Sequence, residues 1–492
     1  MTSRSVSRRP TWFAVLLVGG GAILAGTLLF GRAAPGAPGG HVTTLSSGLP
    51  AATPSGRGPI RIGAVFPLDG DAADLAGQEL RGVRIAADMI NADGGVGGRE
   101  VALDVRALDS ADDAPVVMSA LKADGVSVVV GAYSSDLSIA ASAAADAEGL
   151  VYWEAGAVAD QLTGRGLPLV FRVGASGSDL GSNSARFAAA QLAPRLDLAA
   201  GRLRVAIVAA DDPYARSVAD AAARTAATTG TPIVARLTYN LSAPRWTPLM
   251  TALAASRPDV VILASHVPDG IAFRKAMLAA GLHVKALIGS TMAQCSPDFA
   301  GDLGTDAIGV FASDRPTGGF QPGALDPAAR AVYDRFAGSW ASLSATNPGA
   351  PGASGAAHGA GYGEGDGTPG DAEYTITGPA EPTGIVDGTV PTEEGISGFA
   401  AAWPLFHDVL PAAAAAGSID ATTVATAARA VDLPAGSLPN GAGLRFSADP
   451  ATLGQNERAA AVIWQWQAVR AYTFVWPATY ATGTIRFVPL PQ

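Results

Sequence analysis

The sequence predicts an α/β protein with two similar lobes, each built on a parallel sheet. Short apolar runs of the buried parallel-strand type alternate with segments of helical length and helical periodicity. The same alternation restarts after residue 203, and the chain passes between the two series near Gly174 and again near residues 311–316. Alternation of this kind predicts sheets that are covered by helices on both faces.

Composition sets limits on the class of protein. The chain has 492 residues, of which 48% are hydrophobic and 15% charged, so it is long enough for two or more compact units. Its formal net charge is −10 and it has no basic stripe, which argues against a nucleic-acid partner. Cys295 is the only cysteine, which excludes an intramolecular disulfide and a cysteine-based metal site.

The N-terminus has the pattern of a targeting segment. Residues 1–10 contain three arginines and no acidic residue, and residues 12–30 carry no charge. Residues 1–32 are therefore a signal peptide or a membrane anchor, and the length of the apolar run with its poor cleavage sites favours the anchor. Residues 33–58, rich in Pro, Gly and Ala, are expected to form a flexible linker. The rest of the chain would be extracytoplasmic, either membrane-anchored or secreted.

The first α/β series starts at residue 60. A strand over residues 60–66 precedes a helix with Leu80, Val83, Ala87 and Ile90 on one face, which stops at residues 91–95. The further elements expected in this series are strand 101–108, a helix with Pro115 in its first turn, strand 126–130, helix 136–148, strand 150–153 and strand 169–173.

A helix is expected over residues 178–192, and the second series then follows with the same rhythm. Its expected elements are strand 204–209, helix 214–228, strand 233–239, helix 248–255, strand 260–264, helix 270–280 and strand 285–289. Residues 345–395 interrupt it with 13 Gly and 6 Pro in 51 residues, which predicts a disordered insertion. Helices are expected again at 396–415 and 421–431, and a closing hairpin at 461–466 and 472–476.

Two turns in the first series are candidates for a binding site. Ser134 and Ser135 follow one strand and Gly156 and Ala157 follow the next, at the sheet edge where open α/β proteins usually bind ligands. The unpaired N–H groups of the helix that begins there suit a carboxylate or another anion. Alternatively, the two serines only cap that helix. The residues alone leave both interpretations open.

Several stretches together resemble a known family. They are IRIGAVFPLDG, INADGGVGGRE, VVVGAYSS, LVYWEAGAVADQLTGRG, VFRVGASGSDLG, VAIVAADDPYARS, RPDVVILASHVPDG, KALIGSTMAQ, AVIWQWQ and IRFVPLP. In this order they resemble the type I periplasmic solute-binding proteins, in particular the leucine/isoleucine/valine-binding branch that serves ABC importers. The resemblance covers residues 59–319 and 441–491.

The resemblance implies two Rossmann-like parallel-sheet lobes that are joined by a three-crossover hinge and close on a small ligand. The expected lobes are residues 59–175 with 312–442, and residues 176–311 with 443–492. In the family, the serine turn and a Gly-Ala-Thr turn bind the ligand carboxylate. The matching residues here are Ser134 with Ser135, and Gly156 with Ala157, while Val158 replaces the threonine.

The resemblance also implies further site residues. Tyr214 matches an aromatic ligand wall, whereas Leu75 and His266 replace aromatic residues of the family. Thr291 stands where the family has the acid that receives the ligand ammonium. Burying the ammonium group of a ligand without a counter-charge would cost on the order of several kcal/mol. The ligand is therefore not a standard amino acid, or another carboxylate replaces the missing one.

Glu154 is the first candidate for that carboxylate, with Asp211 or Asp212 behind it. It directly follows a strand at the expected cleft and could receive an amine, amide or urea-like donor. Alternatively, it pairs with an arginine such as Arg172 and only supports the hinge. The full set of candidate ligand-binding residues is Tyr133, Ser134, Ser135, Glu154, Gly156, Ala157, Tyr214, His266 and Thr291.

No motif of the sequence indicates an enzyme. It contains no GxSxG, no GxxxxGK[ST] and no HExxH, and the five histidines are scattered, so we expect neither catalysis nor a cofactor or metal. The expected function is capture of a small polar ligand (an amino acid, amide or urea-like molecule) for the permease and ATPase subunits of an ABC importer. A membrane-tethered sensor or adaptor of the same fold is the alternative, and a secreted hydrolase a remote one.

Overall fold

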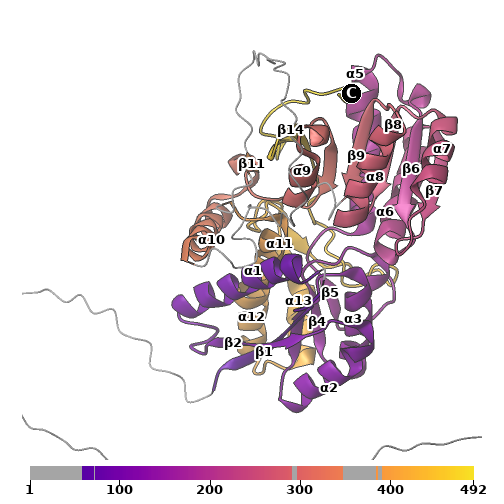
Figure 1. Ribbon diagram of the computed structural model, residues 1–492. Helices are drawn as coiled ribbons and strands as arrows, with labels where there is room; N and C mark the ends of the chain where they lie inside the picture. The colour runs from indigo at the N-terminus through magenta and orange to yellow at the C-terminus, as the bar shows by residue number, and fades with distance from the viewer. Residues whose placement is uncertain (1–57, 71, 291–295, 347–383, 386–389, 492) are drawn as a thin grey trace, which may run out of the picture. The chain divides into compact units, whose positions relative to one another are not determined.

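A computed structural model describes residues 58–70, 72–290, 296–346, 384–385 and 390–491 (Figure 1). The predicted N-terminal segment 1–32, nearly all of the linker 33–58, Thr291 and Cys295 lie outside the described residues. Most of the predicted insertion, residues 347–383 and 386–389, lies outside them as well.

The first sheet has five parallel strands in the order β2-β1-β3-β4-β5. Its strands are short, and β3 and β4 are buried along their whole length. The strands are β1 (Ile60–Phe66), β2 (Val101–Ala107), β3 (Val128–Gly131), β4 (Val151–Glu154) and β5 (Val170–Arg172). The helices between them are α1 (Ala73–Ala92), α2 (Ala114–Ala123) and α3 (Ser135–Ala147).

Helices from distant parts of the chain cover this sheet. Met118 and Leu121 of α2 and Ala141 of α3 form a core on one face. On the other face α1 packs with helices that come much later in the sequence (Figure 1). These are α10 (Pro327–Thr346), α11 (Glu393–Pro404), α12 (Leu410–Ala415) and α13 (Ala421–Ala430).

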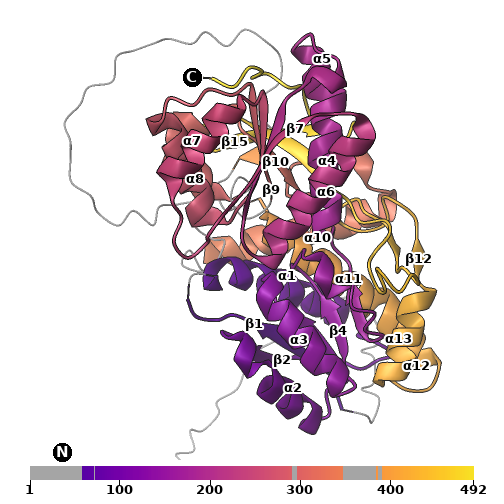
Figure 2. The same ribbon diagram turned by 90° about the vertical axis from the view of Figure 1, so that its right-hand side faces the viewer.

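The second sheet has eight strands in the order β11-β15-β14-β10-β9-β8-β6-β7. The strands from β10 to β7 in this order are parallel, and β14, β15 and β11 are antiparallel (Figure 2). The strands are β6 (Val205–Ala210), β7 (Ile233–Tyr239), β8 (Val260–Ala264), β9 (Ala286–Ser290), β10 (Phe311–Asp314), β11 (Gly384–Ile385), β14 (Val462–Ala468) and β15 (Ala471–Trp476). The helices are α4 (Gly177–Phe187), α5 (Ala193–Arg195), α6 (Pro213–Thr229), α7 (Trp246–Ser256), α8 (Val267–Ala279) and α9 (Pro297–Leu303), and β12 (Asp432–Leu433) pairs with β13 (Leu444–Arg445) apart from this sheet.

The predicted fold class is confirmed: both series form parallel sheets in an α/β fold, and the closing hairpin is β14–β15. The predicted insertion is too long at its C-terminal end, because Glu393 and Glu394 lie buried in the first turn of α11. The predicted lobe bounds also differ in detail. Residues 312–314 belong to β10 of the second sheet, and Leu444 packs in the core beside the first sheet. The lobe bounds stay a proposal, and in the structure the chain passes between the two sheets near residues 174, 315 and 460.

A buried amide holds chain segments together near two of these crossovers. Asn456 is only 2% exposed. Its Nδ2 donates to the carbonyl oxygens of Val173 at 2.9 Å and Gly443 at 2.8 Å. Its Oδ1 accepts from the N–H groups of Arg445 at 3.1 Å and Arg458 at 2.9 Å. All four hydrogen-bonding positions of the amide are therefore used.

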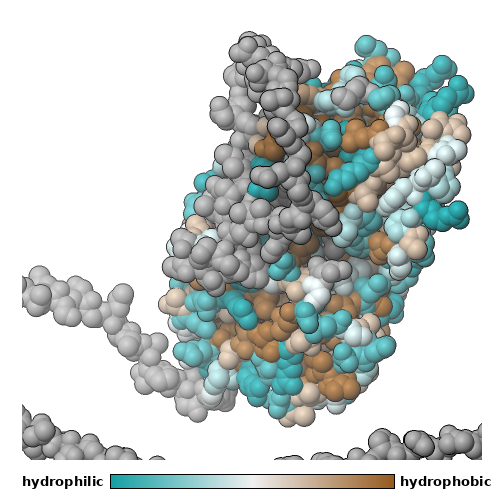
Figure 3. Space-filling model, viewed as in Figure 1, coloured by the Kyte–Doolittle hydropathy of each residue, from teal (hydrophilic) through white to brown (hydrophobic). Residues whose placement is uncertain are grey.

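The described surface mixes residue types. In the view of Figure 3, hydrophilic and hydrophobic residues are interspersed over the coloured part of the surface. The exposed large hydrophobic side chains among the described residues come from separate elements and turns, namely Leu68, Val116, Leu278, Leu343 and Val469. None of the helices within the described residues combines the length and apolar character needed to cross a membrane.

Candidate functional site

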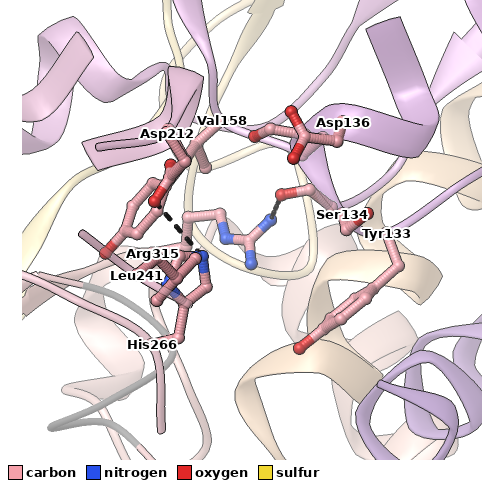
Figure 4. Close-up of a pocket in the computed structure, with 12 residues that line it drawn as sticks. Tyr133, Ser134, Asp136, Val158, Asp212, Leu241, His266 and Arg315 are labelled. Carbon is pink, nitrogen blue, oxygen red and sulfur yellow. Dashed lines mark hydrogen bonds and ion pairs between the residues drawn. The ribbon is translucent and has the colours of Figure 1, made fainter. Parts of the chain in front are cut away.

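A cavity of about 70 Å³ lies where the carboxyl ends of strands from both sheets meet (Figure 4). The turns after β3 and β4 contribute one side of it, and the starts of α6 and α8 contribute the other. It is lined by Tyr133, Ser134, Ser135, Asp136, Gly156, Ala157, Val158, Asp212, Tyr214, Leu241, His266 and Arg315. The cavity thus lies at the sheet edge where the sequence predicted a binding site, and the site itself stays a prediction.

Ser134 and Ser135 place the start of α3 at the cavity. Ser134 is the N-cap of α3, and its Oγ accepts from Leu137 N at a long 3.4 Å. Ser135 Oγ accepts from Ala159 N at 3.1 Å, which ties α3 to the turn after β4. The first N–H groups of a helix have no acceptor within the helix, so this end of α3 offers donors to an anion. Both interpretations of the serines, cap and anion site, remain compatible with this geometry.

Tyr133 occupies an uncommon backbone conformation beside these serines. Its φ is 79°, in the left-handed region that non-glycine residues rarely adopt. The residue is 5% exposed, and Figure 4 shows its ring on the same side of the cavity as Ser134. Backbone strain of this kind is often found where a side chain is held for binding.

The turn at Gly156 and Ala157 uses its backbone N–H groups internally. Both donate to Glu154 Oε1, Gly156 at 2.8 Å and Ala157 at 2.6 Å. The carbonyl oxygen of Gly156 accepts from the Arg315 guanidinium. Although the two residues line the cavity, their N–H groups are already satisfied, so an anion in the cavity would depend on the start of α3.

Glu154 does not line the cavity. Its side chain is fully buried, folded back on its own turn, and a position of this kind does not suit direct contact with a ligand. Burial raises the pKa of Glu154 to about 7. The hydrogen bonds from the N–H groups of Ala157 and Gly156 stabilise the charged form and lower this pKa, but their effect is smaller than that of burial. The alternative ion pair with Arg172 is not formed either, since the Arg172 guanidinium donates to Ala159 O at 2.7 Å and to Thr163 Oγ1 at 3.3 Å.

A group of buried carboxylates lies behind the turn. Glu79 of α1 approaches so closely that a Cβ on Gly156 would come 1.9 Å from Glu79 Oε2. Burial, with the nearby Glu154 carboxylate, raises the pKa of Glu79 well above its ordinary value. Burial and Glu393 likewise raise the pKa of Glu394. This turn therefore needs glycine at position 156, and the acids behind it resist ionisation.

Arg315 is a lining residue that the sequence analysis missed. It is 5% exposed, follows β10 at the expected crossover, and forms an ion pair with Glu393 at the start of α11. Its guanidinium reaches from that pair to the cavity wall at Gly156 (Figure 4). A charged residue immediately before Pro316, at the end of a buried strand, is the signal that would have pointed to it.

Tyr214, Asp212 and His266 form the opposite wall. Tyr214 is buried, and its hydroxyl donates to the carbonyl oxygen of Ser290 at 2.6 Å, so its ring rather than its hydroxyl faces the site. The rings of Tyr214 and His266 are arranged edge to face, and their centroids are 5.2 Å apart. Asp212 is the N-cap of α6, with Oδ1 accepting from Ala215 N at 2.9 Å. Asp212 Oδ2 lies 3.8 Å from His266 Nε2.

The other predicted positions are placed as follows. Thr291 lies outside the described residues, and Leu75 packs against the core beside the first sheet without lining the cavity. Asp136 and Leu241 line the cavity although the sequence did not single them out. Within the described residues, no three His, Cys, Asp or Glu side chains are arranged to hold a metal ion.

Comparison with known proteins identifies the class. The model of the Periplasmic binding protein family matches residues 59–360, and the chain belongs to this family. The Leu/Ile/Val-binding protein homolog 8 of Brucella abortus (strain 2308) is 27% identical over 431 residues, which are 87% of this chain and 93% of that protein. The family and this relative are binding proteins and not enzymes, so the chain is a solute-binding protein, and the hydrolase alternative is excluded.

Solved structures show the same fold. The branched-chain amino acid transporter substrate-binding protein LivJ from Streptococcus pneumoniae, in complex with isoleucine, matches with a TM-score of 0.61 and 18% identity, over 85% of this chain and 100% of that one. A solute-binding protein from R. palustris in complex with benzoate matches with a TM-score of 0.60 and 16% identity, over 88% of this chain and 100% of that one. The family implies an extracytoplasmic location.

Proposed function

We propose that the chain captures a small polar ligand, an amino acid, amide or urea-like molecule, and delivers it to the permease and ATPase subunits of an ABC importer. The observation that carries this proposal is the cavity itself, which combines the start of α3 on one side with the starts of α6 and α8 on the other. A ligand that touches both sides stabilises a closed form by contacts that an open form lacks.

The cavity favours a compact ligand. A water molecule needs roughly 10–15 Å³ of such a cavity, so a volume of about 70 Å³ has room for about five water-sized groups. The residues that we propose as ligand contacts are Tyr133, Ser134, Ser135, Gly156, Ala157, Tyr214, His266 and Thr291, the last of which directly follows β9 in the sequence. We propose Glu154 as a support behind the turn. Asp136, Asp212, Leu241 and Arg315 join them from the lining.

The N-terminal segment supports a membrane-linked location. We propose that residues 1–32 attach the chain to the membrane and that residues 33–58 tether the binding domain outside the cytoplasm. The same features also suit the second candidate function, a tethered sensor or adaptor that binds a ligand without transport. The two functions differ in whether the captured ligand enters the cell.

A ligand screen on the purified full-length chain tests capture. The melting temperature is followed by intrinsic tryptophan fluorescence with amino acids, acetamide, urea and short carboxylates, and each hit is confirmed by calorimetric titration. A ligand at 100 times its Kd should stabilise the folded state by about 2.7 kcal/mol. Uptake of the labelled hit by cells with and without the gene then separates the importer from the sensor. A screen without any hit would contradict capture.

A further inference from the structure

The outer strands of the two large sheets differ in how well they are protected against pairing. β5 has three residues and β11 has two. β7 has seven residues, but its register with β6 shifts beside Val205, as at a β-bulge. Short edge strands and bulges keep the edge of a sheet from pairing with another chain. β2 is the exception, because it has seven residues in unbroken register with β1 and contains no proline, glycine or lysine (Figure 1).

The hydrogen bonds between β1 and β2 show which main-chain groups of β2 face outward. Just before β2, the carbonyl oxygen of Glu100 accepts from Ile60 N at 2.7 Å. Just after β2, Leu108 N donates to Phe66 O at 2.9 Å. Every second residue of a strand bonds to the same parallel neighbour, so the even-numbered residues of β2 bond to β1. The odd-numbered residues therefore present their N–H and C=O groups to the outer edge.

The start of this outer edge is closed, and the rest of it is open. Val101 N donates to Asn91 Oδ1 at 2.8 Å, and Asn91 Nδ2 donates to Val101 O at 2.9 Å. The outward groups of Leu103, Val105 and Ala107 form no hydrogen bond with the described residues, and all three residues are at least partly exposed. Three consecutive outward residues are thus available to a further strand, and Val105 is the middle one.

The charged side chains of β2 are placed symmetrically about Val105. Asp104 precedes it and Arg106 follows it, so both side chains lie on the other face of the sheet from Val105. Asp104 Oδ2 lies 2.6 Å from the Arg61 guanidinium, and Asp104 Oδ1 lies 3.1 Å from Arg106 Nε. Arg106 also pairs with Asp124. The positive and negative groups of this network balance, so the edge carries no net charge that would repel a second copy.

We propose that β2 is an interface between two copies of the chain, whose β2 strands pair antiparallel about a two-fold axis through Val105. In this register Val105 faces Val105 of the second copy, and Leu103 faces Ala107 of the second copy. All the outward N–H and C=O groups of these residues then bond across the axis. The five-stranded sheets of the two copies become one continuous sheet.

The side-chain charges select this register. Asp104 lies directly opposite Arg106 of the second copy, in a pair without main-chain hydrogen bonds, where the Cα atoms approach to about 4.5 Å. Opposite charges stabilise such a pair, and like charges destabilise it. Moving the axis to residue 104 would place Asp104 against Asp104 of the second copy, and moving it to residue 106 would place Arg106 against Arg106 of the second copy. Symmetry and charge together favour a second copy over an unrelated strand.

Two complementary charge reversals test the interface in the full-length chain. Asp104→Arg leaves two positive side chains on β2, and Arg106→Asp leaves two negative ones. Each variant alone brings like charges together at the axis, so its dimer should be weaker than that of the unchanged chain by about tenfold or more. An equimolar mixture of the two variants restores opposite charges at both contacts and should recover the dimer. Sedimentation equilibrium in a mild detergent measures the masses, and circular dichroism checks folding.

The matched control is Arg236→Asp. It reverses a charge on the other seven-residue edge strand, β7, where Arg236 pairs with Asp220. Its dimer should be as strong as that of the unchanged chain. All variants keep residues 1–57, so a dimer that persists in both single reversals forms elsewhere and would overturn the inference. A mixture that stays as weak as its components would overturn it too, and so would an unchanged chain that is monomeric at every concentration, which would leave the edge to a strand of another protein.

Should a charge reversal fail to fold, Val105→Pro provides a second disruption. A proline at this position removes only an N–H that faces the outer edge, and edge strands tolerate proline at such positions. The variant should be monomeric where the unchanged chain is dimeric, and a dimer of unchanged strength would refute the interface. None of these outcomes bears on ligand capture, which the ligand screen tests separately.

Discussion

Glu154 is a buried carboxylate whose ionisation links the stability of the fold to pH. Its pKa is about 7 in the folded chain, because burial penalises the charged form, and near 4.5 without that burial. Between these values the folded state holds a proton that the unfolded state has lost. Stability from this group is therefore fully present below pH 4.5 and is lost as the pH rises through 7, a change of about 3 kcal/mol.

Glu154→Gln removes this titration without removing the acceptor, since a glutamine oxygen can accept from the same N–H groups of Gly156 and Ala157. We expect the free energy of unfolding of the unchanged chain to fall between pH 5 and pH 8, and the fall to be smaller by up to about 3 kcal/mol in the variant. Urea denaturation at several pH values measures this. Glu100→Gln, at an exposed carboxylate, is the control and should keep the slope. An equal slope in Glu154→Gln would contradict the prediction.

The sequence predicted which strand ends meet at this cavity but not the direction of each side chain. Ser134, Tyr214 and His266 follow strand ends, and such positions meet at one edge of a parallel sheet, so their proximity was predictable. Glu154 also follows a strand, but its side chain turns back onto its own backbone. Arg315 reaches the cavity through a pair with Glu393, which is 78 positions away in sequence numbering (393 − 315). Contacts between residues so far apart in the sequence leave no pattern in the sequence around either residue.

Two pairs of helices depend on glycine for close packing. Gly181 of α4 lies so near α6 that an added Cβ would be 2.1 Å from Val218 O and 2.9 Å from Ala222 N. Gly82 of α1 would meet Gly395 O of α11 at 2.1 Å in the same way. Backbone atoms cannot move aside without moving their helix. Each sheet therefore carries a helix pair whose separation is set by the absence of a side chain.

Gly181→Ala should destabilise the fold by about 2 kcal/mol, because overpacking forces α4 and α6 apart. Gly338→Ala is the matched control in α10, where an added Cβ meets nothing within 4 Å. Alanine is the better helix former, so this control should be neutral or stabilising by up to about 1 kcal/mol. Chemical denaturation of both variants measures the difference. A stabilised Gly181→Ala would mean that the two helices can separate at no cost.

Element boundaries were predictable where local chemistry defines them. The strands β1, β7 and β8 fall on the predicted residues, because strand-forming residues there are bounded by turn formers. The start of α11 was missed, since Glu393 and Glu394 beside Gly395 have the composition of a loop. Their burial depends on Arg315, which arrives from a different part of the chain.

At the scale of the whole molecule, the two sheets are linked by short segments. The closure on a ligand that we propose requires these segments to be stable while the lobes move. The N–H of Arg172 donates to Gly454 O at 2.9 Å, and Asn456 N donates to Arg172 O at 3.0 Å. Beside them Arg172 Nε donates to the side chain of Gln455, and Gln455 Nε2 donates to Gly174 O at 3.1 Å. Two crossovers are thus tied together by buried polar groups rather than by apolar packing alone.

Asn456 is the centre of this arrangement, and Asn456→Ala should lower the free energy of unfolding by about 3 kcal/mol or more, because it leaves buried carbonyl and N–H groups without partners. Asn240→Ala is the control: its amide bonds Asp211 and Ala243 in an exposed turn, so its loss should cost well under 1 kcal/mol. Thermal and urea denaturation of the full-length chain measure both. Because Asn456 joins Val173 to Gly443, a variant as stable as the control would mean that the crossovers hold their geometry without it, and that the hinge is set by the sheets themselves.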